Sequence, residues 1–300
     1  MGPPYIRLMI VEKIKNFLNQ PYPFYYQGQD LHKFCLVIFG MALFFNYVFQ
    51  PFSVYEPEHK FHYFWISVIH SISPVILFYL IGWILKPQKH LQDNWLLKNE
   101  VVVFSSVLFL TGVCQFLIRD LIYDNSDNWS WHYLFEEISN TMLVGFLFAA
   151  ILVPINLNRV QKINQIHADV INYGLKSMTL ESKEHIINIQ TQVKADDFLL
   201  NIHEFIYAKA DGNYLEIILR KDEQSERLLK RITSKELENQ LAHFDFIMKV
   251  HRSFLVNLNK IESVSGNAGG YKVAFKGISE LVPVSRNYIP TFDEKMKVNV

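Results

Sequence analysis

The feature that most constrains this chain is a series of long apolar stretches in its first half. Four of them stand before residue 156, namely Phe34 to Phe49, Phe61 to Leu85, Val101 to Ile122 and Leu134 to Ile155. Most approach the ~20 residues that a helix needs to cross a bilayer. The first is the shortest, but extending it to Leu31 and Phe52 gives it a spanning length.

The composition of these stretches favours lipid over a protein interior. Helices buried in a soluble bundle usually keep a polar stripe and some internal charge, whereas Val101 to Ile118 contains no charged residue. Trp129 and Trp131 precede Glu136 and Glu137 at the start of the last stretch, where interfacial anchors are expected. We therefore expect an α-helical membrane region with four transmembrane helices over residues 31–155.

The distribution of Lys and Arg predicts the orientation of these helices. The N-terminal tail and the loop between the second and third stretches are rich in cations: Arg7, Lys13, Lys15, Lys33, Lys86, Lys89 and Lys98. The other two loops contain only Lys60, and Arg119 in a loop with Asp120, Asp124 and Asp127. Because short cytoplasmic loops carry the excess of Lys and Arg, both termini are expected in the cytoplasm.

Residues 1–30 are predicted to form a cytoplasmic amphipathic segment. Between Ile6 and Leu18 the apolar residues recur at helical spacing, with Lys13 and Lys15 off that face. Such a helix can lie in the inner surface of the membrane. A secretory signal peptide is not expected, because charged residues interrupt the apolar run and no small-residue cleavage site follows.

A helical linker is predicted over residues 156–183. Its apolar residues recur at approximate helical spacing: Val160, Ile163, Ile166, Val170 and Ile171. Two interpretations are open, a helix that pairs with its copy in a dimer and a solvated linker helix. His167 and Gly174 interrupt the pattern, so it does not decide between them.

From Ile186 onward the periodicity changes to short β-like runs. These are IINIQT, DFLLNI, FIYAKA, YLEIIL, FLVNL, IESV, YKVAFK and ELVPV, separated by turn signals at residues 211–213, 266–267 and 269–270. Thr233 and Glu236 form a capping box before a helix in KELENQLAHF, and a second short helix is expected from Ser285. We therefore expect a mostly-β domain with one or two short helices over residues 184–300.

Four blocks of this region occur in a recognisable order. FIYAKADGNYLEIIL, RITSKELENQL, FIMKVHRSFLVNLNKIESV and LVPVSRNY resemble the LytTR family of DNA-binding domains over roughly Glu184 to Lys297. The resemblance implies an elongated β fold of bacterial transcription regulators, whose loops enter successive major grooves of a bent duplex. Such domains are most often fused to a receiver domain. Here the apolar stretches take that place, and no receiver-like phosphoacceptor aspartate is recognised.

The resemblance also implies which residues contact DNA. Asn213, Arg252 and Arg286 occupy positions similar to those that reach base edges, and these side chains suit bidentate contacts with adenine and guanine. Small donors and cations around them are expected at phosphates or elsewhere on the DNA: Lys230, Arg231, Lys249, His251, Ser253, Ser285 and Asn287. Tyr214, Phe254 and Val256 are expected in the core.

Each of these residues also has a purely structural interpretation. Asn213 suits a left-handed turn conformation, and Arg286 could form an ion pair with Glu280. Glu184 to Lys297 contains sixteen Lys and Arg and sixteen Asp and Glu. A DNA-binding domain is usually basic, so this balance predicts modest non-specific affinity.

Catalytic and metal-binding patterns are weak in this sequence. GNAGGY lacks the Lys-Ser/Thr ending of a phosphate-binding loop, and no Ser/His/Asp or Cys/His nucleophile arrangement is recognised. Glu56, Glu58, His59 and His62 suit zinc or copper in type, but no helix periodicity brings them together. We therefore expect no enzymatic activity, no cofactor and no metal site. Cys35 and Cys114, the only cysteines, are expected to be unpaired core residues.

The sequence as a whole predicts a multi-pass protein of the bacterial inner membrane that regulates transcription. Its expected partners are double-stranded DNA, the lipid bilayer, a second copy in a homodimer, and a partner membrane protein or small-molecule signal. The alternative is a membrane-anchored signalling scaffold whose β domain binds another protein. A joint substitution of Arg252 and Arg286 separates the two, since only DNA binding requires a large loss of sequence preference.

Overall fold

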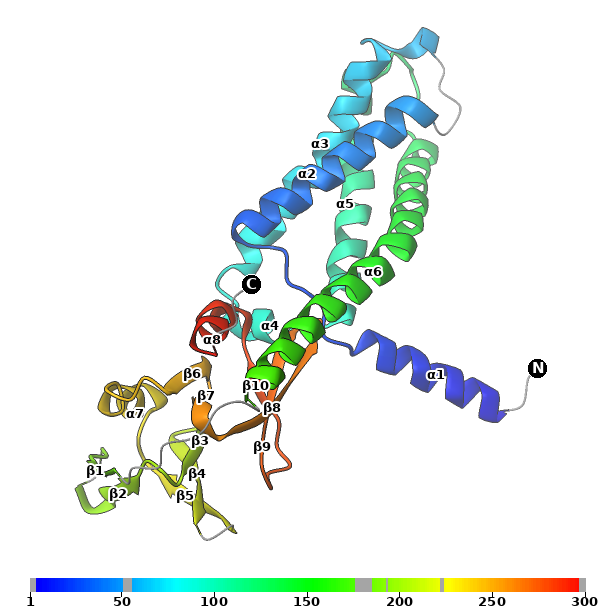
Figure 1. Ribbon diagram of the computed structural model, residues 1–300. Coiled ribbons are helices and arrows are strands. Elements are labelled where there is room, and N and C mark those ends of the chain that lie inside the picture. Colours follow the sequence, from blue (N-terminus) through cyan, green and yellow to red (C-terminus); the bar gives the residue numbers. More distant parts are fainter. Residues whose placement is uncertain (1–3, 51–55, 176–184, 193, 222–223, 297–300) are drawn as a thin grey trace. The chain divides into compact units, whose positions relative to one another are not determined.

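The computed structural model describes residues 4–50, 56–175, 185–192, 194–221 and 224–296 of the chain (Figure 1). The chain divides into two compact units, Met1–Leu157 and Asn158–Val300. The first unit is helical and the second is built mainly of strands.

The first unit contains the helices α1 (Pro4–Leu18), α2 (Gly28–Phe44), α3 (Tyr63–Leu85), α4 (Lys89–Asp93), α5 (Leu97–Ile122) and the start of α6 (Trp131–Leu175). A π-helical turn at Phe45–Phe49 extends α2. Among the described residues, four helices are long and apolar enough to cross a membrane: Gly28–Phe49, Tyr63–Leu85, Leu97–Ile122 and Trp131–Leu175. The prediction of four long apolar helices is therefore confirmed.

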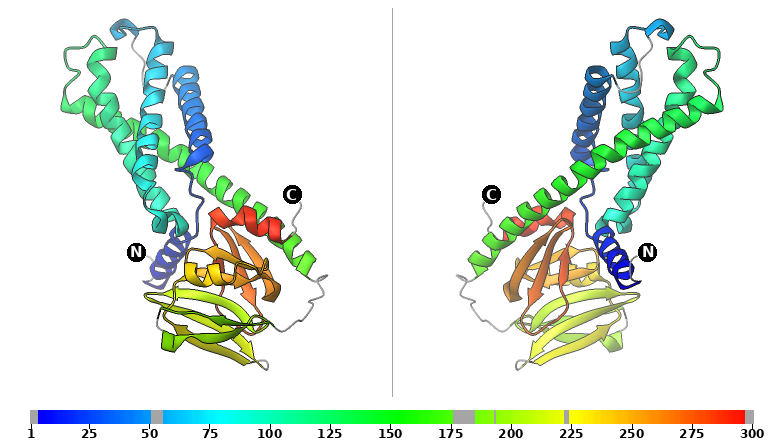
Figure 2. Two further views of the ribbon diagram at one scale, coloured as in Figure 1. Left: turned by 90° about the vertical axis from the view of Figure 1, so that its left-hand side faces the viewer. Right: turned by 90° about the vertical axis from the view of Figure 1, so that its right-hand side faces the viewer.

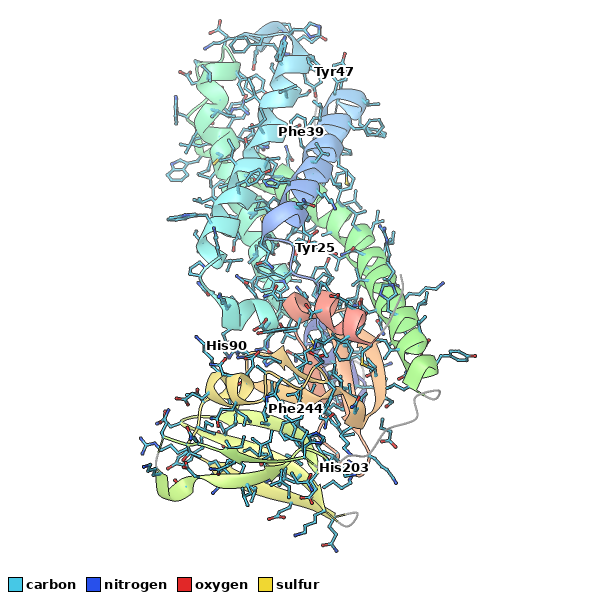
Figure 3. The ribbon with its side chains drawn as sticks, turned by 60° about the vertical axis from the view of Figure 1, so that its left-hand side comes forward. Tyr25, Phe39, Tyr47, His90, His203 and Phe244 are labelled. Atoms are coloured by element: carbon cyan, nitrogen blue, oxygen red, sulfur yellow. The ribbon has the colours of Figure 1, made fainter. Side chains whose placement is uncertain are left out.

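The apolar side chains of these helices largely face outward (Figure 3). In Tyr63–Leu85 and Leu97–Ile122, only 22% of the most apolar window is buried. Where helices do touch, small residues permit it. A Cβ on Gly112 of α5 would lie 2.6 Å from the Cα of Ile138 in α6. Outward apolar faces with small residues at the contacts are the pattern of helices in lipid.

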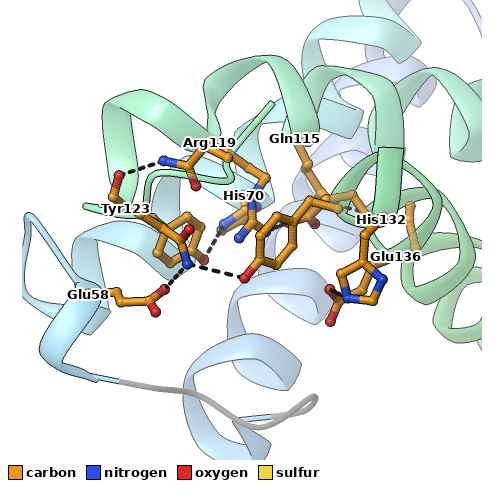
Figure 4. Close-up of polar contacts among 12 residues, drawn as sticks. Glu58, His70, Gln115, Arg119, Tyr123, His132 and Glu136 are labelled. Carbon is orange, nitrogen blue, oxygen red and sulfur yellow. Dashed lines mark hydrogen bonds and ion pairs between the residues drawn. The ribbon is translucent and has the colours of Figure 1, made fainter. Parts of the chain in front are cut away.

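A polar cluster joins three of these helices near one end of the unit (Figure 4). Arg119 of α5 forms an ion pair with Glu137 of α6, and the Arg119 guanidinium carbon lies 3.6 Å from the ring centre of Tyr133. In α3, His70 Nε2 is 3.2 Å from the Tyr123 hydroxyl. The Arg119 and Glu137 side chains are only 9% and 14% exposed. Ionisable groups in apolar helices are costly unless paired, and here they are paired.

The second unit contains three antiparallel sheets in its described part. The largest has the order β5-β4-β3-β7-β6, formed by Gln224–Lys230, Tyr214–Lys221, Phe205–Asp211, Phe254–Asn257 and Ile247–His251. A second has the order β10-β9-β8, formed by Val282–Val284, Gly270–Phe275 and Ile261–Asn267. The third pairs β1 (Ile186–Ile189) with β2 (Phe198–Asn201). Helices α7 (Ser234–Gln240) and α8 (Ile289–Lys295) complete the unit (Figure 2).

These elements confirm the predicted mostly-β fold, with two differences of detail. The strands β5 and β6 were not predicted. In β5 the sequence QSERLLK is almost entirely exposed and shows no apolar alternation, and β6 falls in the cationic segment IMKVH. The last helix begins at Ile289, after a 3-10 turn at Arg286–Tyr288, and not at Ser285.

The capping box of α7 is present as predicted. The Thr233 hydroxyl accepts from the Glu236 amide at 3.1 Å, and the Thr233 amide donates to the Glu236 carboxylate at 2.8 Å. Those hydrogen bonds lower the pKa of Glu236, with the backbone amide of Thr233 contributing most. A helix of only seven residues depends strongly on such a cap.

Replacing Thr233 by Ala is therefore expected to lower the free energy of unfolding of the second unit by about 1 kcal/mol. Urea denaturation of the fragment Asn158–Val300 measures it. The same substitution at Thr291, an exposed residue of α8, should change stability by less than about 0.5 kcal/mol. Equal effects at the two positions would contradict a capping role.

The end of α6 belongs to the second unit and packs against its sheet. Ala168 and Ile171 are 0% and 1% exposed in the core that also includes β8, β9 and β10. The Asn172 amide donates to the Val264 carbonyl at 2.8 Å and accepts from the Val264 amide at 2.7 Å. The predicted linker is thus helical up to Leu175, with one face buried by the β domain. The rest of the predicted linker, residues 176–183, lies outside the described part of the chain.

Candidate DNA-binding interface

One end of the five-stranded sheet gathers the strand termini that carry the predicted DNA contacts. There β3 ends at Asp211 opposite the start of β4 at Tyr214, and β5 ends at Lys230 opposite Leu215. At the same end, β6 finishes at His251 opposite Phe254, the first residue of β7. We call this end the turn edge; it comprises residues 211–214, 230–231 and 251–254, together with residues 285–287, which follow β10 and join this end through the Ser285 amide.

Two backbone hydrogen bonds fix the turns of this edge to each other and to a third segment. The Ala210 amide donates to the Ser253 carbonyl at 2.8 Å, which ties the β6–β7 turn to the end of β3. The Ser285 amide donates to the Val250 carbonyl at 2.8 Å, which ties the segment after β10 to the end of β6. The segments of Asn213, Arg252 and Arg286, distant in sequence, therefore share one edge.

The β3–β4 turn places Asn213 outward. The left-handed backbone conformation falls on Gly212, with φ at 59°, and Asn213 keeps a negative φ. Glycine adopts such a conformation without steric cost, so the turn does not require Asn at the following position. This removes the structural interpretation of Asn213 as a left-handed turn residue.

The predicted site residues differ in exposure. Three are exposed, namely Asn213, Arg231 and Asn287, and three are partly buried, namely Arg252, Ser253 and Arg286. Asn213 is thus open to a direct contact with DNA, and Arg252 is partly accessible. One guanidinium nitrogen of Arg286, Nη1, is buried within the domain and does not face solvent.

The other four predicted residues make contacts within the domain. Lys230 donates to the Asp196 carbonyl at 3.1 Å, and the Lys249 ammonium lies 3.5 Å from the Glu238 carboxylate. His251 is 8% exposed, and its Nδ1 accepts from the Ser253 amide at 3.2 Å. Ser285 is likewise 8% exposed. Contacts of these four with phosphates remain predictions.

Tyr214 is a site residue that the sequence interpretation missed. It was expected in the core with Phe254 and Val256, which are indeed 6% and 0% exposed, but Tyr214 is 45% exposed. The signal was available, because Leu215 and Ile217 are apolar and a strand places Tyr214 on the opposite face from both. The side chain adds an aromatic ring and a hydroxyl to the turn edge beside Asn213.

Acidic residues near this edge are matched by cations. Glu280 interacts with Lys209 and the Tyr207 hydroxyl, and Glu216 forms an ion pair with Arg227. Burial raises the pKa of Glu280, but the hydrogen bonds from Lys209 and Tyr207 outweigh it and hold this pKa below its ordinary value. Glu280 is thus a charged partner of Lys209. The carboxylates of Glu280 and Glu216 are therefore each compensated by a neighbouring cation.

Comparisons with known proteins find a family match over this unit. A family model described as the LytTr DNA-binding domain matches residues 195–297. An uncharacterised response regulatory protein of Vibrio cholerae is 35% identical over 72 residues, which are 24% of this chain and 27% of that protein. The chain thus spans about a quarter of that relative.

Among solved structures, the LytTr DNA-binding domain of a putative methyl-accepting/DNA response regulator from Bacillus cereus is similar to this chain. The two are 20% identical with a TM-score of 0.29, over 38% of this chain and 98% of the other. The domain assignment rests on the family model and on the mostly-β architecture. Residues 195–297 of this chain are therefore a LytTR DNA-binding domain.

Proposed function

We propose that this chain is a membrane-anchored bacterial transcription regulator that binds a specific DNA sequence through the turn edge. The observation that carries the proposal is the meeting of three distant segments, those of Asn213, Arg252 and Arg286, at one end of a single sheet. Arg and Asn are the side chains that discriminate guanine and adenine in the major groove.

Within this proposal the predicted residues take different roles. Asn213, Arg252 and Arg286 read base edges, while Arg231, Ser253 and Asn287 contact phosphates and fix the register of the domain on the duplex. Lys230 and Lys249 keep their contacts with the Asp196 carbonyl and Glu238, His251 holds the Ser253 amide, and Ser285 joins its segment to β6 through its backbone amide. These four residues approach phosphates less closely than the others.

The helices of the first unit anchor the protein in the inner membrane, with both termini in the cytoplasm. Support comes from the outward apolar faces of the four long helices and from the cations of the N-terminal tail and of the loop before α5. In this arrangement α1 lies on the inner membrane surface. The membrane region senses a signal or binds a partner membrane protein. The chain acts as a homodimer.

Selection of DNA from a random pool by the full chain in lipid nanodiscs tests the function. Arg252→Ala and Arg286→Ala are each expected to weaken binding to the selected site by about 1–3 kcal/mol, or about 5- to 150-fold, and to relax the preference at one base pair. Non-specific binding should change little.

Lys272→Ala is the matched control, because Lys272 is an exposed cation of β9, outside the turn edge. It should keep the affinity and the motif. Failure to enrich any motif, or equal losses in all three variants, would reject sequence-specific binding by this edge.

A second function is favoured by one observation, the equal numbers of acidic and basic residues in Glu184 to Lys297. A neutral domain suits binding to another protein, which would make the chain a membrane-anchored signalling scaffold. The same selection decides, since a scaffold enriches no DNA motif.

A further inference from the structure

A stripe of apolar side chains is exposed on the part of α6 that belongs to the second unit. It consists of Ile163, Ile166, Val170 and Tyr173, which are 42%, 51%, 48% and 83% exposed. Their spacings of three, four and three residues are those of the a and d positions of a coiled coil. We call these four residues the α6 stripe.

The opposite face of the same helix is held by the β domain. Ala168 and Ile171 are buried in its core, and Asn164 and Asn172 bond to the backbone of β8 at Asn267 and Val264. Successive residues of an α-helix lie about 100° apart around its axis. The centre of the stripe is therefore roughly 180° around the helix from the face that contacts the β domain. The rotation of the helix is therefore fixed with the stripe outward, and the stripe cannot turn into its own domain.

We propose that the α6 stripe is the contact surface for a second copy of this chain, lying parallel and in register. The proposal rests on the membrane anchoring proposed above, because anchoring gives every copy of α6 the same direction. In that geometry each stripe residue meets its own counterpart, so a copy is the partner whose apolar spacing always matches.

The charges beside the stripe permit this arrangement. Lys162 and Asp169 flank it on one side, and His167 and Gly174 flank it on the other. In a parallel pair, a residue of the first flank faces the copy's residue five positions later, so Lys162 meets His167 and Asp169 meets Gly174. Along the four stripe residues, no two residues with formal charges of the same sign oppose each other. Arg159, at the next d position toward the N-terminus, meets its own copy, and this repulsion ends the stripe there.

The contact is weak by its size, which suits a regulated pairing. Stable interfaces bury about 1,600 Å² of accessible surface in total. Four side chains of this size bury only roughly a few hundred Å² of surface on each copy. Pairing therefore depends on the membrane, which concentrates and aligns the copies, or on DNA that carries two half-sites. Because Asn164 and Asn172 attach α6 to the LytTR domain, a two-fold pair presents its two turn edges as a two-fold pair as well. The half-sites are then inverted repeats.

Disulfide crosslinking of the full chain in membranes tests the stripe. Cys35 and Cys114 are first replaced by Ser, and single cysteines are then placed at each stripe residue and at Gln161 and Gln165. These two are exposed residues of the same helix away from the stripe. Cysteines at a and d positions of a parallel pair come within disulfide range, so oxidation is expected to link the four stripe variants several-fold more than the two controls.

The pattern of crosslinked variants distinguishes a parallel pair of α6 helices from an antiparallel pair. A parallel pair links all four stripe variants. In an antiparallel pair centred on the stripe, Ile166 faces Val170 of the copy and Ile163 faces Tyr173, so no single-cysteine variant meets its own counterpart and the stripe variants link no more than the controls. Linking at Ile166 alone, equal linking at all six positions, or no linking would overturn the proposal.

A DNA readout tests the same surface independently. On a duplex with two inverted copies of the selected motif, the wild type should bind about 100-fold more tightly than on one copy. Ile166→Asp should lose this advantage and keep the single-site affinity, and Gln161→Asp should keep both. A preference for directly repeated sites, or an unchanged Ile166→Asp variant, would overturn the two-fold pairing. If no motif is selected at all, DNA recognition fails, while the crosslinking pattern still decides the pairing.

Discussion

Replacing Ile171 by Ala should lower the free energy of unfolding of the second unit by about 2–5 kcal/mol. Ile171 lies in the segment predicted as a linker helix, and its side chain is 1% exposed in one core with Val264 of β8 and Val273 of β9. Truncation to Ala removes buried carbon atoms and leaves a cavity between the helix and the sheet, and both effects destabilise the fold.

The fragment Asn158–Val300 is the material for this measurement. Urea denaturation can be followed by circular dichroism, since the fragment contains no Trp. Ile166→Ala is the matched control, the same substitution on the exposed face of the same helix, and should cost less than about 0.5 kcal/mol. A fragment beginning at Glu184, which lacks α6, should unfold at a lower urea concentration. Similar losses at Ile166 and Ile171 would contradict one-sided docking of α6.

Docking of α6 has a consequence for signalling. The last turns of α6 (Trp131–Leu175) are part of the DNA-binding unit. A displacement of the helix must either carry the β domain with it or break the contacts of Asn164 and Asn172. Energetic coupling between two sites requires a structural element that can adopt two distinct arrangements.

The apolar helices and most of the strands could be predicted from the sequence. Spans of about 20 apolar residues without internal charge leave few alternatives to long apolar helices. Strands such as FIYAKA and YLEIIL carry enough apolar and β-branched residues to be recognised, and the pair Thr233 and Glu236 marks the start of α7 without further information.

Other features depend on tertiary contacts that a pattern does not specify. Val170 and Ile171 are adjacent apolar residues in an approximate repeat, and only the packing on β8 decides that Ile171 is buried and Val170 exposed. Likewise, Lys249 and Arg252 are cations of one short segment. The position of Glu238 on α7 directs Lys249 into the domain, so residue type alone predicted its exposure poorly.

Replacing either Arg119 or Glu137 by Leu is expected to destabilise the first unit by about 3–5 kcal/mol. Each substitution leaves the other charge buried at the junction of α5 and α6, where the two side chains are 9% and 14% exposed (Figure 4). Glu136→Leu is the control. That carboxylate is next in sequence but 39% exposed and 3.7 Å from His132, so its loss should cost less than about 1 kcal/mol. Denaturation by SDS in bicelles measures all three variants.

The double variant Arg119→Leu, Glu137→Leu distinguishes two reasons for the pair to exist. Removing both charges together leaves no uncompensated group, so the double variant should regain most of the stability lost by each single variant. If it does, the pair is not needed for folding, and its presence among apolar helices points to a role in sensing or transmitting a signal. Single variants as stable as the wild type would instead mean that water reaches and solvates the remaining charge.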